Sequence, residues 1–259
     1  MSNTNNTVYV RVMTIDGCYK VVQLKINFID SPIIHMENEY PLCINKSVII
    51  SAGQGYNSYL WSTGQTSEHI TITQPGNYWV TVTENHAAGL VCSSTKDFNI
   101  FLSNFATITS ISTLDWTDNE NVITANVTGI GIYEYSLDGM HFQDSNTFTN
   151  LTVGVYNIFV RDKNGCGVVG EDVFLLNYPR FFTPNNDGIN DNWKVKFSEY
   201  EPGIKVEIYD RQGKLLKLLD SSNSWDGIYN GSLLPSDDYW FVVHRVNGKI
   251  YKGHFTMKR

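Results

Sequence analysis

The stretch HITITQPGNYWVTVT, residues 69–83, predicts two β-strands joined by a turn. Apolar and polar residues alternate with a period of two on both sides of Gln-Pro-Gly, and Pro and Gly are common turn formers. This period places one set of side chains in a core and the other set toward water. The set expected in the core is Ile70, Ile72, Tyr78, Val80 and Val82. The opposite set contains Trp79 and the threonines, so the stretch predicts a sheet with one buried face.

The composition of the whole chain favours the same fold class. The 259 residues are 42% hydrophobic and 13% aromatic, and only 17% are charged. Aromatic and β-branched residues favour strands, whereas segments rich in Glu, Lys, Ala and Leu are nearly absent. The length exceeds that of one average domain. We therefore expect an all-β protein made of several small sandwiches.

Three segments of the chain share one order of features: an alternating strand, a polar turn, a cysteine and a second alternating strand. They are YVRVMTIDGCYKVVQLKINFIDSP (9–32), YWVTVTENHAAGLVCSSTKDFNIFLSN (78–104) and YNIFVRDKNGCGVVGEDVFLLNYP (156–179). Their cysteines, Cys18, Cys92 and Cys166, follow one another at intervals of 74 residues. A period of this length indicates tandem domains of the size of a small sandwich.

These repeats and the change of pattern after them divide the chain into four predicted segments. They are 1–30, the C-terminal part of a truncated repeat, 31–103 and 104–177, two complete repeats, and 178–259, a different domain. The start MSNTNNTVYV lacks the charged and apolar regions of a secretory signal. We therefore expect the chain to be the end of a longer protein whose export signal lies upstream.

The charge of the chain is unevenly distributed. Residues 1–177 hold 7 Lys or Arg and 16 Asp or Glu, whereas residues 178–259 hold 12 and 10. An acidic body argues against nucleic acid as a partner, because nucleic-acid binding needs a basic surface. No segment has the roughly 18 apolar residues of a membrane span, so no transmembrane segment is expected.

The repeats resemble the Ig-like and SprB-type repeats of giant bacterial surface adhesins. The residues that carry the resemblance are YLWSTGQT (59–66), GNYWVTVT (76–83), YEYSLDGMHFQDSNTF (133–148) and VRDKNGC (160–166). The order Cys43, Trp61, Cys92 is similar to that of immunoglobulin domains, although Cys92 follows its strand instead of lying in it. We expect a disulfide between Cys43 and Cys92, with two buried thiols as the alternative. The resemblance implies tandem Ig-like β-sandwich modules.

The last eighty residues resemble a different family. FFTPNNDGINDNW (181–193), VEIYDRQGKLL (206–216), WDGIYNG (225–231), LPSDDYWFVV (234–243) and YKGHFTMKR (251–259) stand in the same order as in the gliding-motility-associated C-terminal domain. That domain is the type B sorting domain of the type IX secretion system. The resemblance implies a small β-sandwich that acts as a secretion address. It also implies two partners, the type IX translocon and a PorP/SprF-like outer-membrane protein, and a final location on the cell surface or in the medium.

The final strand of this domain is the predicted recognition site. Alternation puts Tyr251 and Phe255 on one face, where they are expected to hold the strand in place. The residues expected to contact the partner are Lys252, His254, Lys258 and Arg259. Pairing of an unpaired strand edge with the partner is one physical route, since its backbone groups are free to bond. The preceding segment YWFVVHRV is apolar on both faces and is expected to be the central strand.

The opening stretch of this domain has two interpretations. Asn185, Asp187 and Asp191 surround Gly188 in the manner of a calcium loop, but the stretch has only two carboxylates and no terminal Glu. The favoured alternative is a turn in which Asn and Asp bond nearby backbone amides, with Trp193 entering the first strand. We therefore expect no cofactor, and calcium remains the weaker alternative.

No pattern in the chain indicates catalysis. Asp237-Asp238 is explained by a turn before a strand, and the six His residues lack metal-ligand spacing. A nucleophile elbow and a phosphate loop are both absent from the sequence. Four aromatic residues are candidates for a sugar-stacking platform: Tyr59, Trp61, Trp79 and Tyr133. Sandwich aromatics usually belong to cores, so only Trp79, on the face opposite Tyr78, is the favoured candidate.

The sequence as a whole predicts the C-terminal fragment of a large exported surface protein, a gliding-motility adhesin without enzymatic activity. A surface polysaccharide or another adhesion ligand is its expected target. The alternative is the C-terminal tail of a secreted enzyme with carbohydrate-binding-like β modules. Both share the sorting domain, so the upstream sequence would discriminate between them.

Overall fold

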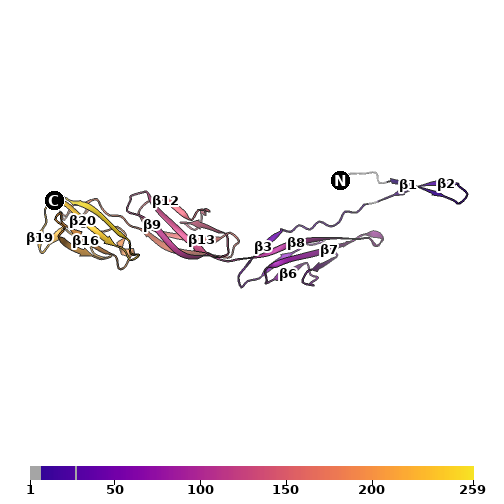
Figure 1. The fold of residues 1–259 in the computed structure, drawn as a ribbon, viewed down its shortest axis with the longest axis horizontal. Helices are drawn as coiled ribbons and strands as arrows, with labels where there is room; N and C mark the ends of the chain where they lie inside the picture. Colours follow the sequence, from indigo (N-terminus) through magenta and orange to yellow (C-terminus); the bar gives the residue numbers. More distant parts are fainter. Residues whose placement is uncertain (1–6, 27) are drawn as a thin grey trace. The chain divides into compact units, whose positions relative to one another are not determined.

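The computed structural model describes residues 7–26 and 28–259, which form two compact units, residues 1–102 and 103–259. The first six residues of the predicted segment 1–30, and its residue 27, lie outside the described residues. The described residues form strands and two short 3-10 helices, η1 (Ala87–Gly89) and η2 (Ser198–Tyr200), with no α-helix among them (Figure 1). The all-β fold class expected from the composition is confirmed. Over the described ranges, no helix has the length and apolar character needed to span a membrane.

The first unit begins with a two-stranded hairpin. Strand β1 (Thr7–Met13) pairs in antiparallel fashion with β2 (Tyr19–Lys25), from Thr7 opposite Lys25 to Met13 opposite Tyr19. The turn is closed by the Thr14 N–H, which donates to the Cys18 carbonyl at 2.8 Å. Most side chains of both strands are exposed, so the hairpin has no core of its own.

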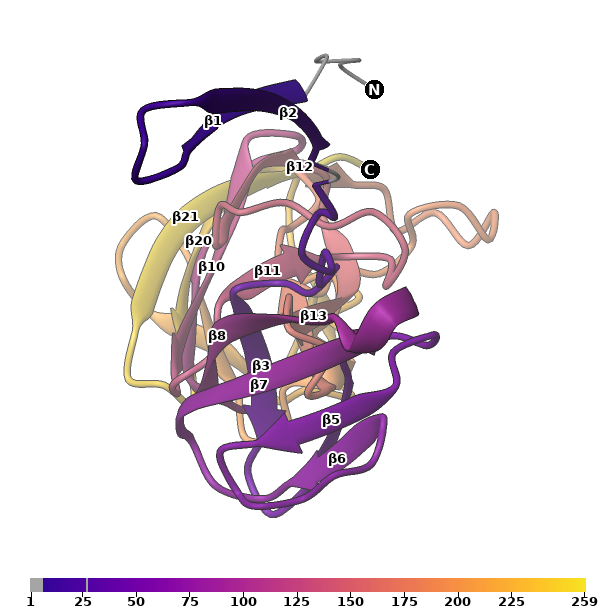
Figure 2. The same cartoon turned by 90° about the vertical axis from the view of Figure 1, so that its right-hand side faces the viewer.

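The rest of the first unit is a sandwich of two antiparallel sheets. Its strands are β3 (Glu39–Cys43), β4 (Val48–Ser51), β5 (Ser58–Trp61), β6 (His69–Ile72), β7 (Gly76–Asn85) and β8 (Val91–Ser103). One sheet has the order β3-β8-β7-β5, and Figure 2 shows β7 and β5 side by side in it. The other sheet is β4-β6. The alternation in residues 69–83 gives the expected faces, since Ile70, Ile72, Val80 and Val82 are at most 3% exposed.

The core of this sandwich draws side chains from both sheets. Its buried members include Ile50 and Ile70 from the smaller sheet and Val80 and Phe98 from the larger one. Trp61 is 1% exposed, and its indole N–H donates to the Ser67 carbonyl at 2.8 Å. A buried indole needs such an acceptor, so Trp61 is a core residue.

The expected disulfide between Cys43 and Cys92 is not formed, because Cys92 is a free cysteine. Cys92 is the second residue of β8 and pairs with Glu84 at the hairpin end of β7 and β8. The buried part of β8 lies further along, at Phe98 and Ile100, roughly 20 Å from Cys92 at 3.3 Å per residue. Cys92 therefore lies beyond the core that an Ig-type bridge crosses.

The second unit begins with another sandwich. Its strands are β9 (Thr107–Leu114), β10 (Asn121–Thr128), β11 (Tyr133–Ser136), β12 (Thr147–Leu151), β13 (Gly154–Asp162) and β14 (Val168–Leu175). They form two sheets, β12-β10-β9 and β11-β13-β14. Ile123 from the first sheet and Ile158 and Val160 from the second are fully buried between them.

A buried carboxylate fixes one end of this sandwich. Asp162, 1% exposed, accepts hydrogen bonds from the Ser103 hydroxyl at 2.8 Å, the Ile132 N–H at 3.1 Å and the Cys166 N–H at 3.2 Å. A buried carboxylate is tolerated only with such partners. Asp162 therefore ties the VRDKNGC turn to the residue at which the unit begins.

The last domain of the second unit contains one five-stranded sheet. Its elements are β15 (Phe181–Phe182), β16 (Lys205–Tyr209), β17 (Leu215–Leu219), β18 (Ile228–Tyr229), β19 (Ser232–Leu233), β20 (Asp237–His244) and β21 (Ile250–Met257). The sheet order is β15-β21-β20-β16-β17, with β18 and β19 forming a separate hairpin. Strand β20 lies in the centre, as its two apolar faces predicted.

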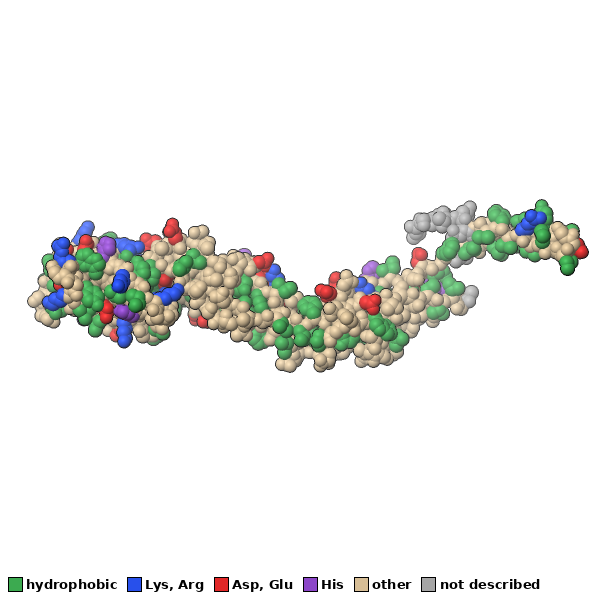
Figure 3. Space-filling view, in the orientation of Figure 1, with side chains coloured by type: hydrophobic (Ala, Val, Ile, Leu, Met, Phe, Trp, Pro, Cys, Tyr) green, Lys and Arg blue, Asp and Glu red, His purple; other side chains and the backbone are tan. Residues whose placement is uncertain are grey.

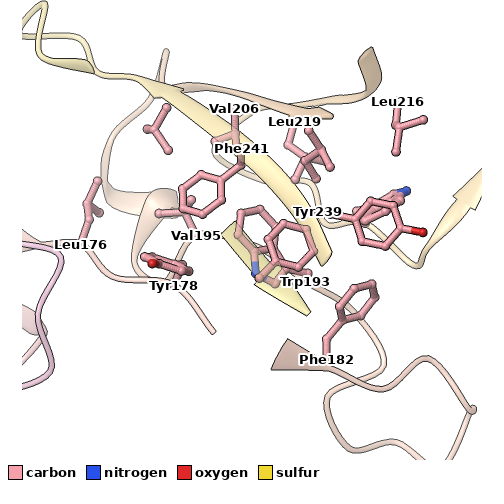
Figure 4. Close-up of a cluster of buried hydrophobic side chains, with 14 of the residues drawn as sticks. Leu176, Tyr178, Phe182, Trp193, Val195, Val206, Leu216, Leu219, Tyr239 and Phe241 are labelled. Atoms are coloured by element: carbon pink, nitrogen blue, oxygen red, sulfur yellow. The ribbon is translucent and has the colours of Figure 1, made fainter. Parts of the chain in front are cut away.

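The core of this domain is rich in aromatic rings, which Figure 4 shows converging from the sheet and from the loops beneath it. Trp193 stacks on Phe255 with ring centroids 4.1 Å apart, and Trp225 contacts Tyr239 edge-on at 5.1 Å. The indole N–H groups of Trp193 and Trp225 donate to backbone carbonyls. The sheet and the loop tryptophans therefore form the two layers of a small sandwich.

The segment that begins at Trp193, which was expected to be a strand, does not pair continuously with one neighbouring strand. Trp193 bridges to Trp225 and Lys196 bridges to Asn177, so neighbouring residues pair with different segments. Phe197 then has a φ of 65°, in the left-handed region, which ends the extended backbone. The alternation correctly predicted that Trp193 and Val195 are buried, but the strand that it also predicted at this position does not form.

Candidate recognition site at the C-terminal strand

The two faces of β21 carry the residues that the sequence assigned to them. Phe255 is fully buried and Tyr251 is partly buried on the inner face. Lys252 and His254 are exposed on the outer face, and Lys258 and Arg259 are exposed beyond the end of the strand. The positively charged side chains of the predicted site therefore lie at the surface, while the aromatic ones hold the strand on the core.

One edge of β21 is only partly covered. Strand β20 pairs with all of β21, but β15 pairs only with Thr256 and Met257. The N–H groups of Thr256 and Lys258 donate to Arg180 and Phe182 at 3.0 Å on this side. Backbone groups alternate in direction along a strand, so those of Lys252 and His254 point to the same side, where no described strand pairs with them.

Arg259 is anchored by the domain itself. Its guanidinium donates to the carbonyl oxygens of Leu234 at 3.1 Å and of Pro184 and Gly227 at 3.2 Å. Its backbone N–H donates to the Ser236 hydroxyl at 2.9 Å. Arg259, which the sequence placed among the partner contacts, is exposed and also bridges the opening stretch and the WDGIYNG loop.

The glycine of that loop is required by this arrangement. Gly227 has a φ of 78°, and a Cβ at this position would lie 2.4 Å from the Met257 sulfur and 3.0 Å from the Arg259 guanidinium. Both the backbone conformation and the space therefore exclude a side chain. The Trp-Asp-Gly sequence packs directly under the C-terminal strand, which accounts for the occurrence of both in one domain.

The opening stretch forms a turn closed by its own carboxylates. Asp191 accepts hydrogen bonds from the N–H groups of Asn185 at 3.0 Å, Asn186 at 2.7 Å and Gly188 at 2.8 Å. Asp187 accepts from the Ile189 N–H at 2.8 Å. The side-chain amide of Asn185, bonded to Asp187 at 2.9 Å, is the main cause of the lowered pKa of that carboxyl. These contacts are those of the Asx-type turn that the sequence favoured.

No group of three or more His, Cys, Asp or Glu side chains in the described ranges is arranged to hold a metal ion. At the candidate loop of Asn185, Asp187 and Asp191, backbone amides bond both carboxylates. A cation at this site would compete with those amides for the same oxygens.

The outer face of the sheet around Lys252 and His254 combines apolar and charged side chains. Trp240 is 42% exposed and lies opposite His254, with ring centroids 6.5 Å apart. On the next strand Glu207 accepts a hydrogen bond from the Tyr209 hydroxyl at 2.7 Å and contacts His244 at 3.3 Å. The Tyr209 bond first, and His244 second, lower the pKa of Glu207. Figure 3 shows Lys and Arg side chains among hydrophobic ones on the visible face of this domain.

Residues of the preceding sandwich complete the core beneath β21. The indole of Trp116 stacks on Tyr251 with centroids 4.1 Å apart and planes 8° apart. The backbone N–H of Trp116 donates to the Leu176 carbonyl at 3.0 Å. The buried amide of Asn177 donates to the Thr117 carbonyl at 3.1 Å and to Asp118 at 2.8 Å. The loop after β9 is therefore part of the structure that supports the last strand.

An arginine joins two buried carboxylates at the same place. Arg245 contacts Asp115 at 2.7 Å and Glu201 at 2.9 Å, and all three side chains are at most 6% exposed. Burial raises the pKa of Asp115, although Arg245 and the Leu176 N–H act in the opposite direction. Arg245 is shared by both carboxylates, while Lys249 acts more weakly on Asp115 and the Val246 N–H donates to Glu201 at 2.8 Å.

The sequence did not indicate this junction. Asp115 and Trp116 lie in a turn and belong to no periodic pattern, and Asp115 is 130 positions from Arg245. The one available signal was an apolar Trp inside the polar stretch DWTDNEN, residues 115–121. Aromatic side chains contribute strongly to core and interface packing.

Of the four aromatic residues that are candidates for a sugar-stacking platform, three are held within the protein. Trp61 is buried, the Tyr59 hydroxyl donates to the Gly53 carbonyl at 2.9 Å, and the Tyr133 hydroxyl accepts from the Gly131 N–H at 2.9 Å. Trp79 is 37% exposed. Its exposure keeps it as a candidate ligand contact.

Comparison with known proteins gives one family match and several distant structural similarities. Residues 176–257 match the CHU_C Type IX secretion signal domain. No curated protein matches the chain. Among solved structures, Sidekick-1 immunoglobulin domains 1–5 are 12% identical, with 96% of this chain and 65% of that one covered and a TM-score of 0.33.

Two further structures are similar at the same low level. The eight N-terminal Ig domains of Down Syndrome Cell Adhesion Molecule are 11% identical, with 100% of this chain covered and a TM-score of 0.28. The chain spans 44% of the length of that structure. PorZ, described as a surface component of the type IX secretion system of Porphyromonas gingivalis, is 14% identical over 71% of this chain and 29% of its own, with a TM-score of 0.26.

The cores described above fill the space between two layers in each case, which agrees with tandem Ig-like sandwiches followed by a smaller sandwich. The family match covers the five-stranded sheet, the Trp-Asp-Gly loop and the last strand. Residues 176–257 are therefore a type IX secretion signal domain, which directs this protein across the outer membrane to the cell surface.

Proposed function

We propose that the chain is the C-terminal part of a large surface repeat protein, an adhesin of gliding motility. In this proposal residues 1–30, 31–103 and 104–177 are repeat modules of a stalk, and residues 178–259 are the sorting and attachment module. The support is the order of the parts: Ig-like sandwiches lead directly into a secretion signal domain. The role is recognition and assembly, without catalysis.

The partner surface in this proposal is the outer edge of β21. Lys252, His254 and Lys258 are exposed there, and the backbone edge beside Lys252 and His254 has no pairing strand among the described residues. An open edge accepts a strand from another protein, and charged side chains next to it select the partner. The translocon and a PorP/SprF-like outer-membrane protein are the proposed partners. Arg259 and the pair Tyr251 and Phe255 serve by holding this edge in position.

Charge reversal at the edge tests the proposal. The double variant Lys252→Glu, His254→Glu in the full chain is expected to stop export in a type IX-competent cell while the melting temperature is unchanged. The matched control is Lys217→Glu, an exposed lysine on β17 at the opposite edge of the same sheet. Normal export of the double variant would overturn the assignment of the edge.

The alternative function is the tail of a secreted enzyme that uses the sandwiches as carbohydrate-binding modules. The observation in its favour is the exposure of Trp79 on the outer face of its sheet. The sequence upstream of this chain discriminates between the two: further repeats support the adhesin, and a catalytic domain supports the enzyme.

A further inference from the structure

Trp79 lies on the outer face of β7 and differs from three tryptophans that are at most 1% exposed. Trp61, Trp193 and Trp225 each donate their indole N–H to a backbone carbonyl. Trp79 is 37% exposed, and its indole N–H has no acceptor among the residues that the structure describes. Within the same residues, its ring has neither an aromatic nor a cationic neighbour. The indole therefore presents an uncovered apolar surface and an available donor.

Polar side chains surround this ring in a fixed register. Asp97 lies directly opposite Trp79 on β8, and Asn77 and Asn99 form the next pair along the same face. Asn38 adjoins Asn99, whose N–H donates to the Asn38 carbonyl at 2.8 Å. These residues line a shallow open depression next to Trp79.

The side chains of Asn77, Asp97 and Asn99 have no hydrogen-bond partner in the described part of the chain. Elsewhere in the chain Asn and Asp side chains bond backbone groups: Asn121 makes three such contacts and Asp191 makes three. Each free amide offers two donors and an acceptor, and the carboxylate offers acceptors. The face therefore presents several uncommitted polar groups beside one exposed ring.

The backbone under this face is rigid. The backbone N–H of Trp79 donates to the Ser62 hydroxyl at 3.3 Å, and the backbone N–H of Ser62 donates to the Trp79 carbonyl at 2.9 Å. The neighbours of Trp79 on the opposite face, Tyr78 and Val80, pack on the core, where Val80 is fully buried. A site on a packed sheet holds its side chains in position without ordering on binding.

We propose that Trp79, Asn77, Asp97 and Asn99 form a binding site for a neutral carbohydrate. The apolar C–H face of a sugar ring packs on the indole, and its hydroxyl groups, which both donate and accept, bond the amides and the carboxylate. The Trp79–Asp97 and Asn77–Asn99 rows lie about 7 Å apart along the strands, which suits one or two sugar units of a chain. This site would give the proposed adhesin the class of its ligand. The adhesive role of the site therefore rests on the proposed function, whereas carbohydrate binding itself does not.

The local charge favours a neutral ligand over an anionic one. Asp97 is the only charged residue lining the depression, and the nearby Lys96 ammonium is bonded to the Asn38 side chain. A polyanion needs several free cations at its site, and this face has none among its lining residues. The mixture of amides with one carboxylate instead matches hydroxyl groups.

Affinity electrophoresis of the purified full chain tests the site. Native gels contain, one at a time, laminarin, xylan, mannan, pullulan or hydroxyethyl cellulose. The wild-type chain is expected to be retarded by at least one of these polymers. Trp79→Ala is expected to raise the dissociation constant about tenfold or more, and Asn99→Ala to raise it by a smaller factor, with unchanged melting temperature.

The matched control is Trp240→Ala, which removes an equally exposed tryptophan from the sheet of the last domain and is expected to bind as the wild type does. Retardation by none of the five polymers, or equal retardation of Trp79→Ala and the wild type, would overturn the proposal. Binding by the purified chain is independent of export. A wild-type chain that binds but is not exported contradicts the proposed export function, whereas a wild-type chain that is exported but does not bind contradicts only the carbohydrate site.

Discussion

Trp116 of the last Ig-like sandwich lies flat on Tyr251 of the C-terminal strand, with ring centroids 4.1 Å apart. Trp116 stands outside the family match at residues 176–257, whereas Tyr251 stands within it. The two rings belong to one buried cluster that also contains Tyr178 and Phe241. The core of the secretion signal domain is therefore completed by a residue of the module before it.

Removal of the Trp116 ring should destabilise the second unit. The side chain is 8% exposed, so Trp116→Ala leaves a cavity against Tyr251 and is expected to lower the free energy of unfolding by about 3–5 kcal/mol. Urea denaturation of the full chain measures this change. Trp240→Ala, at an exposed position, is the control and should cost less than about 1 kcal/mol. Equal effects of the two variants would show that the stack does not stabilise the junction.

Arg245 should be the most sensitive charged residue of the domain. Arg245→Met leaves Asp115 and Glu201 as two buried carboxylates without their shared partner, at an expected loss of about 3–5 kcal/mol of unfolding free energy. The control is Arg211→Met, because Arg211 is 64% exposed and its pair with Asp237 spans 4.0 Å. Chemical denaturation at neutral pH compares the two. A loss no greater for Arg245→Met than for Arg211→Met contradicts the role of the buried pair.

The raised pKa of Asp115 predicts a pH dependence of stability with a definite sign. A carboxyl whose pKa is raised by folding binds its proton more tightly in the folded state, so its contribution is complete below its unfolded value of 3.8. That contribution is lost as the pH rises through the raised folded value. The unfolding free energy of the wild type minus that of Asp115→Asn should therefore fall as the pH increases over this window.

Urea denaturation at a series of pH values from about 3 to 7 measures that difference. Glu120→Gln, at an exposed position five residues along the same turn, is the matched control for loss of one carboxylate. A difference that rises with pH would mean that Arg245 outweighs burial and that the pKa of Asp115 is lowered.

The opening turn should depend on Asp191 and not on calcium. Asp191→Ala removes the acceptor of three backbone N–H groups and is expected to cost about 1–2 kcal/mol. Because those oxygens are already bonded, millimolar calcium is expected to leave the melting temperature of the wild type unchanged. A melting temperature that rises with calcium in the wild type, and does not in Asp191→Ala, would establish the calcium loop instead.

Local patterns in the sequence predicted the faces and order of the strands well. Period-two alternation placed Ile70 and Ile72 inside and Trp79 outside, and the doubly apolar YWFVVHRV segment became the central strand β20. The same rule placed Lys252 outside and Phe255 inside on β21. Burial of one sheet face is enough to determine these features, because a shift of one residue reverses every side chain.

Contacts between distant segments were not predictable in the same way. The partners of Trp116 and Arg245 are chosen by the packing of two modules, which leaves no periodic trace in a single sequence. The Cys43–Cys92 disulfide was wrong: the order Cys, Trp, Cys resembles that of immunoglobulin domains, but Cys92 lies at the hairpin end of β8, away from the core. Arg259 is exposed, but it also bonds three carbonyl oxygens that only the fold brings together.

Export of a reporter tests the central claim, that the last domain is a secretion address, most directly. A fluorescent protein with an inner-membrane signal is fused ahead of residues 1–259 and expressed in a type IX-competent cell, with a matched fusion that ends at residue 175. The account predicts that the full fusion reaches the surface or the medium, where added protease cleaves it in intact cells, and that the shortened fusion stays in the periplasm. Retention of the full fusion in the periplasm, or export of the shortened one, would contradict the claim.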